Sequence, residues 1–288
     1  MPIRNVLIVA KKSAYQTYFD EYQKRPLREL ARKGDKALLG IRRSHNTHYE
    51  TLAHVRKVLK KQNIPAEVSF RGEPFNPKKY DFVITVGGDG SFLEASHRVG
   101  HKLILGVNSD KSHSVGQLCT ADSANFERFF SRILRGDFRT VRLNRMKITF
   151  NNKPLAFPVL NDVLVSHLCP AAMSHYLLRI GGRTERQRSS GVWISTAAGS
   201  TAAVHSAGGR VLPRSSASLQ YRTREPFEGH GEHYRLTGGV LSKGRGITLV
   251  SQMQEGMLYL DGAHHSMPFR YGDKIVISGG PPLNTVSF

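Results

Sequence analysis

The chain is poor in cysteine, tryptophan and acidic residues, and these shortages narrow what it can be. It has 288 residues, of which two are cysteines, Cys119 and Cys169, and one is a tryptophan. Two cysteines are too few for a disulfide framework or a four-ligand zinc site, so we expect two reduced thiols. No apolar stretch approaches the roughly 18 residues that a membrane-spanning helix requires. The sequence therefore argues against a disulfide-rich scaffold, a zinc module and a helical membrane protein.

The scarcity of acidic residues leaves a strong positive charge. Lys and Arg number 42 against 22 Asp and Glu, which gives a formal net charge of +20. Such a balance favours anionic partners, and nucleic acids and polyphosphorylated small molecules are two candidate classes. The basic residues are spread along the chain, which has no zinc finger, RNP-type aromatic motif or basic zipper region. We therefore expect phosphorylated small molecules as ligands, with no nucleic acid and no membrane as partner.

The N-terminus begins Met-Pro-Ile-Arg and passes at once into the apolar residues 6–9. This segment is too short for the apolar core of a signal peptide, and it lacks the Ser-rich, amphipathic character of a transit peptide. We therefore expect a cytoplasmic protein.

Strand and helix patterns alternate over residues 1–139. This alternation predicts an α/β N-terminal domain with a Rossmann-like, largely parallel sheet. A capping-box sequence at residues 47–50 predicts the start of one helix, and a second is expected to begin near Ser91. Asp122 is expected to cap a third helix, which Gly136 would end. Short apolar runs predict buried strands at residues 6–9, 81–86 and 102–107.

From residue 140 onward the pattern changes. Short apolar or alternating runs, most of them separated by Gly and Pro turns, predict a β-rich C-terminal domain over residues 140–288. The extreme C-terminus could pack back on the first domain, and residues 213–236 are polar and basic without a readable period. The strands are expected at residues 142–150, 155–165, 176–180, 192–196, 246–252, 257–260 and 274–278.

The sharpest motif is Gly-Gly-Asp-Gly-Ser-Phe at residues 87–92, between a predicted strand and a predicted helix. Glycines let the backbone approach a ligand closely, and the N–H groups at a helix start suit phosphate. A carboxylate would repel phosphate, so Asp89 makes sense if it accepts a hydroxyl proton or holds a metal beside a transferring phosphoryl group. The alternative is an ordinary turn in which Asp89 caps the helix.

Two further motifs place polar residues at strand ends. Residues 106–110 (Gly-Val-Asn-Ser-Asp) follow a predicted strand, where ligands lie in open α/β sheets, so Asn108 and Asp110 could bind polar ligand groups. Asn161 and Asp162 interrupt an apolar strand, and one of the two is expected to point inward, where a ribose or purine edge would satisfy it. In both places a turn stabilised by Asn and Asp side chains is the alternative.

The fourth motif is rich in small residues. Residues 189–203 run from a predicted strand into Ser-Thr-Ala-Ala-Gly-Ser-Thr-Ala, and Ser-Ala-Gly-Gly follows at 206–209. Gly199, Ser200 and Thr201 permit close approach and add hydroxyl donors, as a nucleotide-binding loop needs. Tight packing of small residues against a neighbouring element is the alternative.

Other chemistries have weaker support. The 13 histidines show no metal-binding spacing such as HExxH, and we expect most of them to be solvated or satisfied in the core. No G-x-S-x-G nucleophile motif is present. Asp261-Gly262 follows an apolar run and predicts a hairpin turn.

In this order and spacing, the motifs resemble those of the NAD kinase family. That family carries GGDG followed by Thr or Ser, then G-x-N, a central Asn with Glu or Asp, S-T-x-x-G-S-T-A, and a late D-G turn. The resemblance covers nearly the whole chain and is strongest to the mitochondrial-type branch. GGDG alone also occurs in diacylglycerol and sphingosine kinases, so the full set is what makes the resemblance specific.

The resemblance implies an NAD kinase-like fold and transfer of the ATP γ-phosphoryl group to the 2′-hydroxyl of the adenosine ribose of NAD. Mg²⁺ would accompany ATP, and a homodimer or higher homo-oligomer is implied. Asp89 would orient or deprotonate the hydroxyl, and Asn161 and Asp162 would bind the adenosine part. His175 would lie near the dinucleotide and Arg188 near a phosphate. The implied binding residues are Gly87, Gly88, Gly90, Ser91, Asn108, Asn161, Asp162, His175, Arg188, Gly199, Ser200, Thr201 and Ala202.

The chain departs from the family pattern at four positions. Asp162 is one methylene shorter than the usual Glu, Ser190 replaces an Asp, Ala203 replaces an aromatic residue and Ala263 replaces a Gln. These changes leave the preference between NAD and NADH open. Two alternatives stay in view: a lipid kinase of the same superfamily, and a non-catalytic binder of dinucleotide or nucleic acid.

Overall fold

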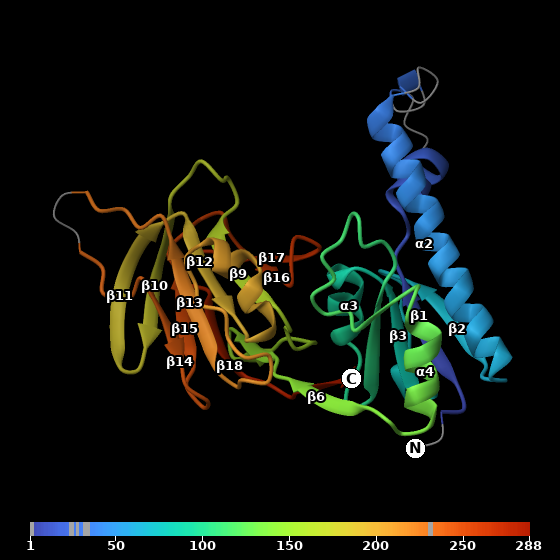
Figure 1. The fold of residues 1–288 in the computed structure, drawn as a ribbon. Helices are drawn as coiled ribbons and strands as arrows, with labels where there is room; N and C mark the ends of the chain where they lie inside the picture. Colours follow the sequence, from blue (N-terminus) through green and yellow to red (C-terminus); the bar gives the residue numbers. More distant parts are fainter. Residues whose placement is uncertain (1–2, 23–25, 27–28, 31–34, 230–232) are drawn as a thin grey trace. The chain divides into compact units, whose positions relative to one another are not determined.

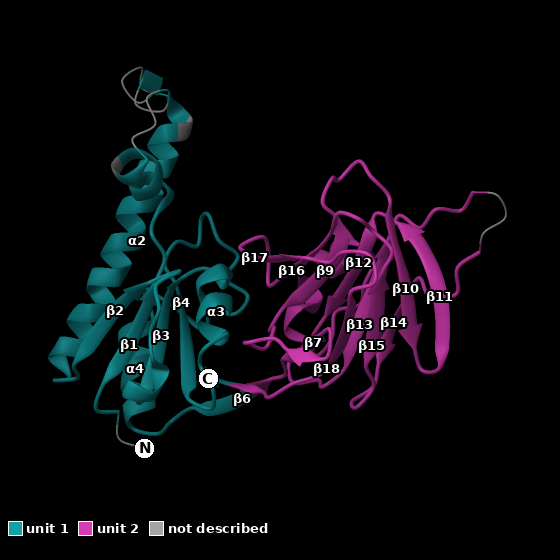
Figure 2. Cartoon of the chain, turned by 180° about the vertical axis from the view of Figure 1, so that it is seen from behind, with its two compact units in different colours: residues 1–141, 284–288 teal, residues 142–283 magenta. Residues whose placement is uncertain are grey.

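The structure is a computed structural model that describes residues 3–22, 26, 29–30, 35–229 and 233–288 (Figure 1). The chain divides into two compact units, shown in different colours in Figure 2. Unit 1 comprises residues 1–141 and 284–288, and unit 2 comprises residues 142–283. The division falls close to the boundary expected after residue 139, and the last five residues belong to unit 1.

Unit 1 is built on a largely parallel sheet. Its strand order is β2-β1-β3-β4-β19-β6, with the short β5 paired to β4. Strands β1, β2, β3 and β4 run parallel to their neighbours, as does β19 beside β4. The strands are β1 (Val6–Ala10), β2 (Ala66–Phe70), β3 (Phe82–Gly87), β4 (Leu103–Asn108), β5 (Ala121–Asp122), β6 (Arg139–Leu143) and β19 (Leu283–Ser287).

Helices cover both faces of this sheet, so the α/β prediction is confirmed. Every residue of β1 and β3 is buried, as expected for strands with both faces covered. One face packs against α2 (Lys36–Lys61) and α4 (Phe126–Leu134) in a single apolar cluster that includes Ile8, Val55 and Phe126. On the other face, Phe92 of α3 (Asp89–Ser96) packs against β4, where a Cβ on Gly106 would stand 3.0 Å from its ring. Among the described residues, no helix has both the length and the apolar content needed to cross a bilayer.

Two of the three helix starts expected in unit 1 are wrong, whereas the start expected near Ser91 is confirmed to within two residues. Helix α2 begins at Lys36, and Thr47 lies inside it with its carbonyl oxygen accepting a hydrogen bond of 2.9 Å from the Thr51 hydroxyl. The Thr-x-x-Glu pattern also fits a helix surface, and only the buried Leu38 upstream marks the true start. Helix α3 begins at Asp89, two residues before Ser91.

The third helix start is also shifted. The residue preceding α4 is Asn125, and Asp122 instead accepts the backbone N–H groups of Ala124 and Asn125 at 2.8 and 3.0 Å. This is an Asx-type turn that leads into the helix. Gly136 ends α4 as predicted, with a φ of 78° that favours glycine.

Unit 2 contains two six-stranded antiparallel sheets, which confirms the β-rich prediction. One has the order β11-β10-β15-β18-β7-β8 and the other β14-β13-β12-β9-β16-β17. Their inner faces share one apolar cluster that includes Tyr176 and Leu249 from the first sheet and Val163 and Ile194 from the second. The first sheet has β7 (Met146–Phe150), β8 (Lys153–Pro154), β10 (Ser174–Ile180), β11 (Arg183–Ser189), β15 (Ile247–Ser251) and β18 (Lys274–Gly279); the second has β9 (Asp162–His167), β12 (Gly191–Ser195), β13 (Leu219–Arg224), β14 (Gly238–Leu241), β16 (Gly256–Leu260) and β17 (His265–Pro268).

Two of the expected strands differ in extent from those observed. The run at 142–150 is divided between β6 and β7, and the run at 155–165 becomes a strand only from Asp162. No pattern in the sequence predicted β11, whose residues are all polar. None predicted β13 either, which lies within residues 213–236, where no period was found. A short 3₁₀ turn (Ala198–Thr201) and helix α5 (Ala203–Ser206) follow β12.

Candidate functional site

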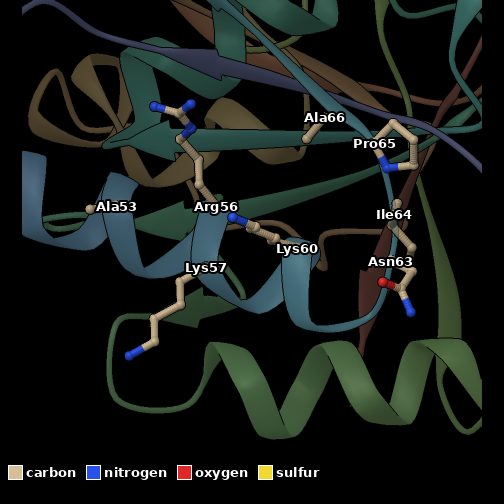
Figure 3. Close-up of a pocket in the computed structure, with 8 residues that line it drawn as sticks. All are labelled: Ala53, Arg56, Lys57, Lys60, Asn63, Ile64, Pro65 and Ala66. Carbon is tan, nitrogen blue, oxygen red and sulfur yellow. The ribbon is translucent and has the colours of Figure 1, made fainter.

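A ligand could bind at either end of the parallel strands of unit 1. A basic pocket lies at one of these ends. A pocket of about 640 Å³ lies beside the C-terminal end of α2 and is lined by Arg56, Lys57, Lys60 and residues 63–66 (Figure 3). Ala66 is the first residue of β2, so this pocket lies at the amino edge of the parallel strands. Ligands of open α/β sheets bind at the carboxyl edge. The carboxyl ends of the strands are therefore the stronger candidate for a ligand site.

At the carboxyl edge, the glycines of residues 87–90 allow the backbone to pass close to its neighbours. A Cβ on Gly87 would stand 2.2 Å from the Ser91 hydroxyl oxygen, and a Cβ on Gly88 would stand 2.1 Å from that of Ser114. Gly88 precedes the first turn of α3, whose N–H groups begin here. The turn at residues 87–90 therefore packs closely against its neighbours. It also presents the N–H groups of a helix start, which suit an anion.

Asp89 stands in the first turn of α3, but its carboxylate does not cap that helix. Its Oδ1 accepts the backbone N–H of Leu118 at 2.7 Å, and its Oδ2 accepts that of Gln117 at 3.0 Å. The carboxylate is thus fixed by a loop 28 residues further along the chain. The alternative in which Asp89 serves as an ordinary helix cap does not describe this turn.

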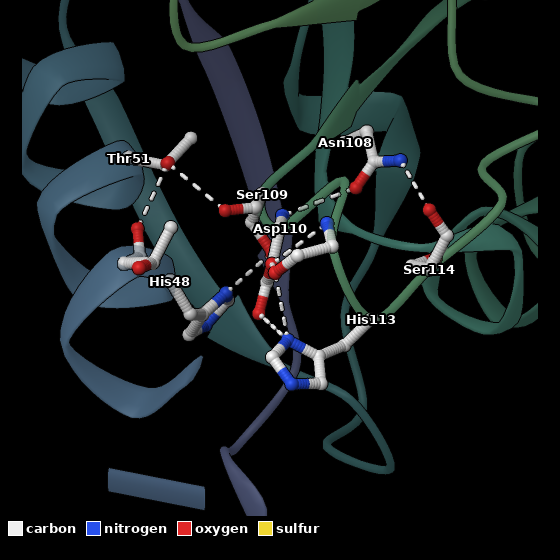
Figure 4. Close-up of polar contacts among 9 residues, drawn as sticks. His48, Thr51, Asn108, Ser109, Asp110, His113 and Ser114 are labelled. Carbon is white, nitrogen blue, oxygen red and sulfur yellow. Dashed lines mark hydrogen bonds and ion pairs between the residues drawn. The ribbon is translucent and has the colours of Figure 1, made fainter. Parts of the chain in front are cut away.

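Asn108, at the end of β4, binds the same loop. Its Nδ2 donates to the carbonyl oxygen of Ser114 at 3.0 Å, and its Oδ1 accepts the N–H of Asp110 at 3.1 Å (Figure 4). A Cβ on Gly116 would stand 2.3 Å from Asn108 Nδ2, and Gly116 has a φ of 64°. The structure therefore brings Asn108 and the predicted turn at residues 87–90 together around residues 110–118.

A buried histidine links α2 to this region. His48 Nδ1 lies 2.8 Å from the Ser109 hydroxyl (Figure 4). Its Nε2 lies 2.9 Å from the carbonyl oxygen of Lys11. Burial, together with the charge of Lys11, lowers the pKa of His48 to about 4. His48 is therefore neutral at physiological pH, and it is a core histidine with satisfied hydrogen bonds.

The carboxylate of Asp110 accepts hydrogen bonds from neighbouring side chains. Burial alone would raise its pKa, but hydrogen bonds from Ser112, Ser44 and His113 outweigh this and hold the pKa of Asp110 well below its usual range. The Ser112 hydroxyl lies 2.5 Å and His113 Nδ1 2.8 Å from its carboxylate. Asp110 therefore organises the loop, as in the alternative of a turn stabilised by Asn and Asp side chains.

Two cations at the carboxyl edge were missed by the sequence analysis. Lys11 follows β1 and, with Ser13, His45 and His113, lines a pocket of about 300 Å³. Arg71 follows β2, and a Cβ on Gly90 would stand 3.0 Å from its guanidinium. A basic residue directly after a parallel strand is a signal that could have identified both.

In unit 2, the structure brings the third and fourth motifs together. Asp162 opens β9 and pairs in register with Ser195 of β12. A Cβ on Gly199 would stand 2.2 Å from the carbonyl oxygen of Asn161 and 2.7 Å from its Oδ1. Small size at residue 199 is therefore what allows the turn after β12 to reach Asn161.

The remaining residues of the fourth motif differ in accessibility. The Ser200 hydroxyl is buried, donates to the carbonyl oxygen of Ala197 at 2.7 Å and accepts the N–H of Leu212 at 2.9 Å. Thr201 is exposed and Ala202 is half-buried. Of the two hydroxyls, that of Thr201 is the one open to a ligand.

Asp162 is a buried acid beside another acid. Burial, with the charge of Asp261 added, raises the pKa of Asp162 to about 7. Asp261 lies in the turn between β16 and β17 at a φ of 52°, and its carboxylate accepts backbone N–H groups of residues 160–162. The sequence predicted only a hairpin turn at Asp261. In the structure, the side chain of this turn also binds the backbone of residues 160–162, which the sequence did not indicate.

His175 and Arg188 face each other across β10 and β11. The Arg188 guanidinium lies 4.6 Å from the ring centroid of Phe227, a cation–π contact. These strands belong to the sheet that does not contain β9, the strand that begins at Asp162. The structure therefore brings His175 and Arg188 to each other within unit 2, in a sheet separate from the other predicted residues.

Comparisons with known proteins identify close relatives of the chain. No protein-family model matches it. The chain is 35% identical to Probable NADH kinase of Oryza sativa subsp. japonica, over 98% of this chain and 96% of the relative. It is 32% identical to NADH kinase of Arabidopsis thaliana, over 83% of each chain. Its fold is similar to that of an NAD kinase from Archaeoglobus fulgidus solved in complex with ATP, with a TM-score of 0.70, 22% identity and coverage of 98% of this chain and 93% of that one.

Proposed function

Because the chain belongs to the NAD kinase family, we propose that it transfers the γ-phosphoryl group of ATP to the 2′-hydroxyl of the adenosine ribose of NAD or NADH. The observation that carries this proposal is 35% identity to a relative named as an NADH kinase over nearly the full length of both chains. The Gly-Gly-Asp-Gly turn at the carboxyl edge of a parallel sheet adds a site of suitable chemistry.

Unit 1 would hold the donor phosphates and the reacting hydroxyl. Gly87 and Gly88 let the backbone approach the phosphates, and the first turn of α3 offers N–H groups to them. Lys11 and Arg71 would neutralise phosphate charge from the ends of β1 and β2. Asp89 would accept the proton of the ribose hydroxyl as the hydroxyl oxygen bonds to the γ-phosphorus of ATP and the bond from that phosphorus to the ADP oxygen breaks, releasing ADP. Catalysis of this kind depends mainly on positioning and electrostatic stabilisation.

Magnesium fits this site as a companion of ATP. The ion usually keeps several waters and binds substrate phosphate oxygens, so ATP would carry it to the turn at residues 87–90 and Asp89 would stay available as the proton acceptor. Mg²⁺ would neutralise charge on the phosphoryl oxygens.

Unit 2 would hold the dinucleotide. Asn161, Asp162 and the exposed Thr201 would bind the adenosine part, with Gly199 leaving room for close approach. His175 and Arg188 would contact a more distant part of the same ligand. The names of the two relatives favour NADH as the acceptor. The lipid-kinase and non-catalytic alternatives gain no support from these relatives.

The decisive experiment is an assay for NADP(H) with the purified protein. NAD and NADH are compared as acceptors, and ATP and inorganic polyphosphate as donors, with and without Mg²⁺. We expect product with ATP and Mg²⁺, and a higher kcat/KM for NADH than for NAD. Absence of NADP and NADPH under all these conditions would reject the proposal. Light scattering of the same sample tests the proposed homo-oligomer, and fractionation of the source cells tests the proposed cytoplasmic location.

A further inference from the structure

The backbone at the predicted dinucleotide residues is held by two side chains from distant parts of unit 2. The first is Asp261. Its Oδ2 accepts the N–H of Leu160 at 2.9 Å, and its Oδ1 accepts those of Asn161 and Asp162 at 2.5 and 3.3 Å. The N–H of Asp261 itself donates to the carbonyl oxygen of Asp162 at 2.9 Å.

The second is Thr196, at the end of β12. Its hydroxyl donates to the carbonyl oxygen of Leu160 at 2.5 Å, and its N–H donates to that of Asn161 at 3.0 Å. Asp261 and Thr196 together therefore satisfy every backbone N–H and C=O of residues 160–162. A short segment whose six backbone polar groups are all bound by two residues has little freedom to change its conformation.

Thr196 also joins this segment to the fourth motif. Its hydroxyl oxygen accepts the N–H of Gly199 at 3.3 Å, and Gly199 packs on the Asn161 carbonyl. One side chain thus connects the two stretches that the proposed function assigns to the dinucleotide. The Asn161 side chain itself donates from Nδ2 to Asp162 at 3.2 Å, so its direction depends on the segment that carries it.

These contacts are buried, and the charge of Asp261 interacts with that of Arg145, another buried residue of unit 2. Asp261 is 8% exposed and Thr196 is fully buried. Arg145, 2% exposed, has its pKa lowered to about 10 by burial, an effect that the charge of Asp261 opposes. Hydrogen bonds from backbone N–H groups to a buried carboxylate are among the stronger ones in proteins, and losing the acceptor leaves buried donors unpaired.

We propose that Asp261 and Thr196 are positioning residues that fix Asn161 for binding of the dinucleotide. The proposal rests on the proposed function, because it takes Asn161 to be a dinucleotide contact. Neither residue needs to touch the ligand. Their effect would reach it through the orientation of the Asn161 side chain and the fit of Gly199 against it.

The test is a comparison of KM values for the dinucleotide and for ATP in Asp261→Asn and Asp273→Asn. Asp273 is the matched control, because it also ties a turn of unit 2, accepting the N–H of Arg270 at 2.7 Å and Nδ2 of Asn151 at 2.7 Å. We expect Asp261→Asn to raise the KM for the dinucleotide at least tenfold while the KM for ATP stays within twofold. Asp273→Asn should leave both KM values within twofold even where it lowers the thermal midpoint equally. An unchanged dinucleotide KM in folded Asp261→Asn overturns the proposal.

Thr196 supplies a second pair of variants that does not depend on the folding of Asp261→Asn. Thr196→Ser keeps the hydroxyl and should retain the KM of the unmodified protein, whereas Thr196→Val should raise the dinucleotide KM at least tenfold. Equal KM values in these two variants contradict a positioning role.

Asn161→Ala separates failure of this proposal from failure of the proposed function. A raised dinucleotide KM in Asn161→Ala, with no change in Asp261→Asn and Thr196→Val, rejects the positioning role and leaves the kinase assignment intact. An unchanged KM in Asn161→Ala rejects the positioning role together with the assignment of Asn161. A lack of turnover by the unmodified protein rejects the proposed function itself, and the positioning role with it.

Discussion

The Oδ1 atom of Asp89 lies 2.7 Å from the backbone nitrogen of Leu118, so the proposed catalytic carboxylate is already a hydrogen-bond acceptor. The second bond, from the N–H of Gln117 to Oδ2, fixes the orientation of the carboxylate from a loop 28 residues further along the chain. A carboxylate oxygen has more than one lone pair, so each oxygen can still accept a proton from a bound hydroxyl. The loop therefore orients Asp89 without blocking the role we propose.

Asp89→Asn should lower kcat by about 10² to 10⁴-fold, because the amide cannot accept the hydroxyl proton. Substrate affinity should change little, whereas the thermal midpoint should fall, because the amide NH2 would face one of the two backbone N–H groups that the carboxylate accepts. Asp81→Asn is the control, since Asp81 accepts the N–H of Arg4 at 2.9 Å at the amino edge of the same sheet. Steady-state kinetics of both variants provides the measurement. A kcat for Asp89→Asn within tenfold of the unmodified enzyme would remove Asp89 from the catalytic role.

Gly199→Ala should damage the dinucleotide site and the stability of unit 2 together. The added Cβ would stand 2.2 Å from the Asn161 carbonyl oxygen, which is backbone and cannot swing away. We expect a stability loss on the order of 1–3 kcal/mol and at least a tenfold drop in kcat/KM for the dinucleotide. Gly279→Ala, with no atom within 4 Å of the new Cβ, is the control. Denaturant unfolding and kinetics give the result, and wild-type behaviour of Gly199→Ala would mean that the turn is free to move.

The sequence predicted those parts of the fold whose signal is local. Strands β1, β3 and β4 are continuous apolar runs, and burial on both faces of a parallel sheet produces that pattern. Strand β11 is polar throughout, so neither a run nor an alternation indicated it. The start of α2 was missed because the Thr-x-x-Glu pattern fits a helix interior as well as a cap.

The candidate site also has residues that a local sequence signal predicts and residues that only long-range contacts bring to it. Glycine spacing and the position after a strand identified residues 87–90, and the structure keeps them at the carboxyl edge. The contact of Asp261 with Asn161 spans 100 residues, and nothing in either local sequence requires it. Arg71 and Lys11 each follow a strand directly, which is a local signal, but the order β2-β1-β3 in the sheet decides whether such cations lie near the turn at residues 87–90.

His48 should make the protein sensitive to acid. Its pKa is lowered to about 4 in the fold by burial and by the charge of Lys11, against about 6.5 in the unfolded chain. Between these values the unfolded chain binds more protons, so the stability contributed by neutral His48 is complete above pH 6.5 and is lost as the pH falls towards 4. His48→Gln should flatten this part of the stability curve, whereas the exposed His101→Gln should not. Urea unfolding from pH 4.5 to 7.5 measures the pH dependence of the unfolding free energy. Parallel stability curves for His48→Gln and the unmodified protein would contradict the role of His48.

Asp162 should have the opposite pH dependence. Burial and the charge of Asp261 raise its pKa to about 7, so the folded protein holds a proton that the unfolded chain releases near pH 4. The stability linked to this proton is complete below pH 4 and is lost as the pH rises through 7, with a slope of about 1.4 kcal/mol per pH unit at most. Asp162→Asn resembles the protonated acid at every pH, so it should already be more stable than the unmodified protein at pH 5. This difference in unfolding free energy should grow up to pH 7 and level off towards pH 8, where the folded protein has also released the proton. Urea unfolding at pH 5, 6, 7 and 8 measures it, and a constant difference between the two proteins would show that Asp162 is ionised throughout.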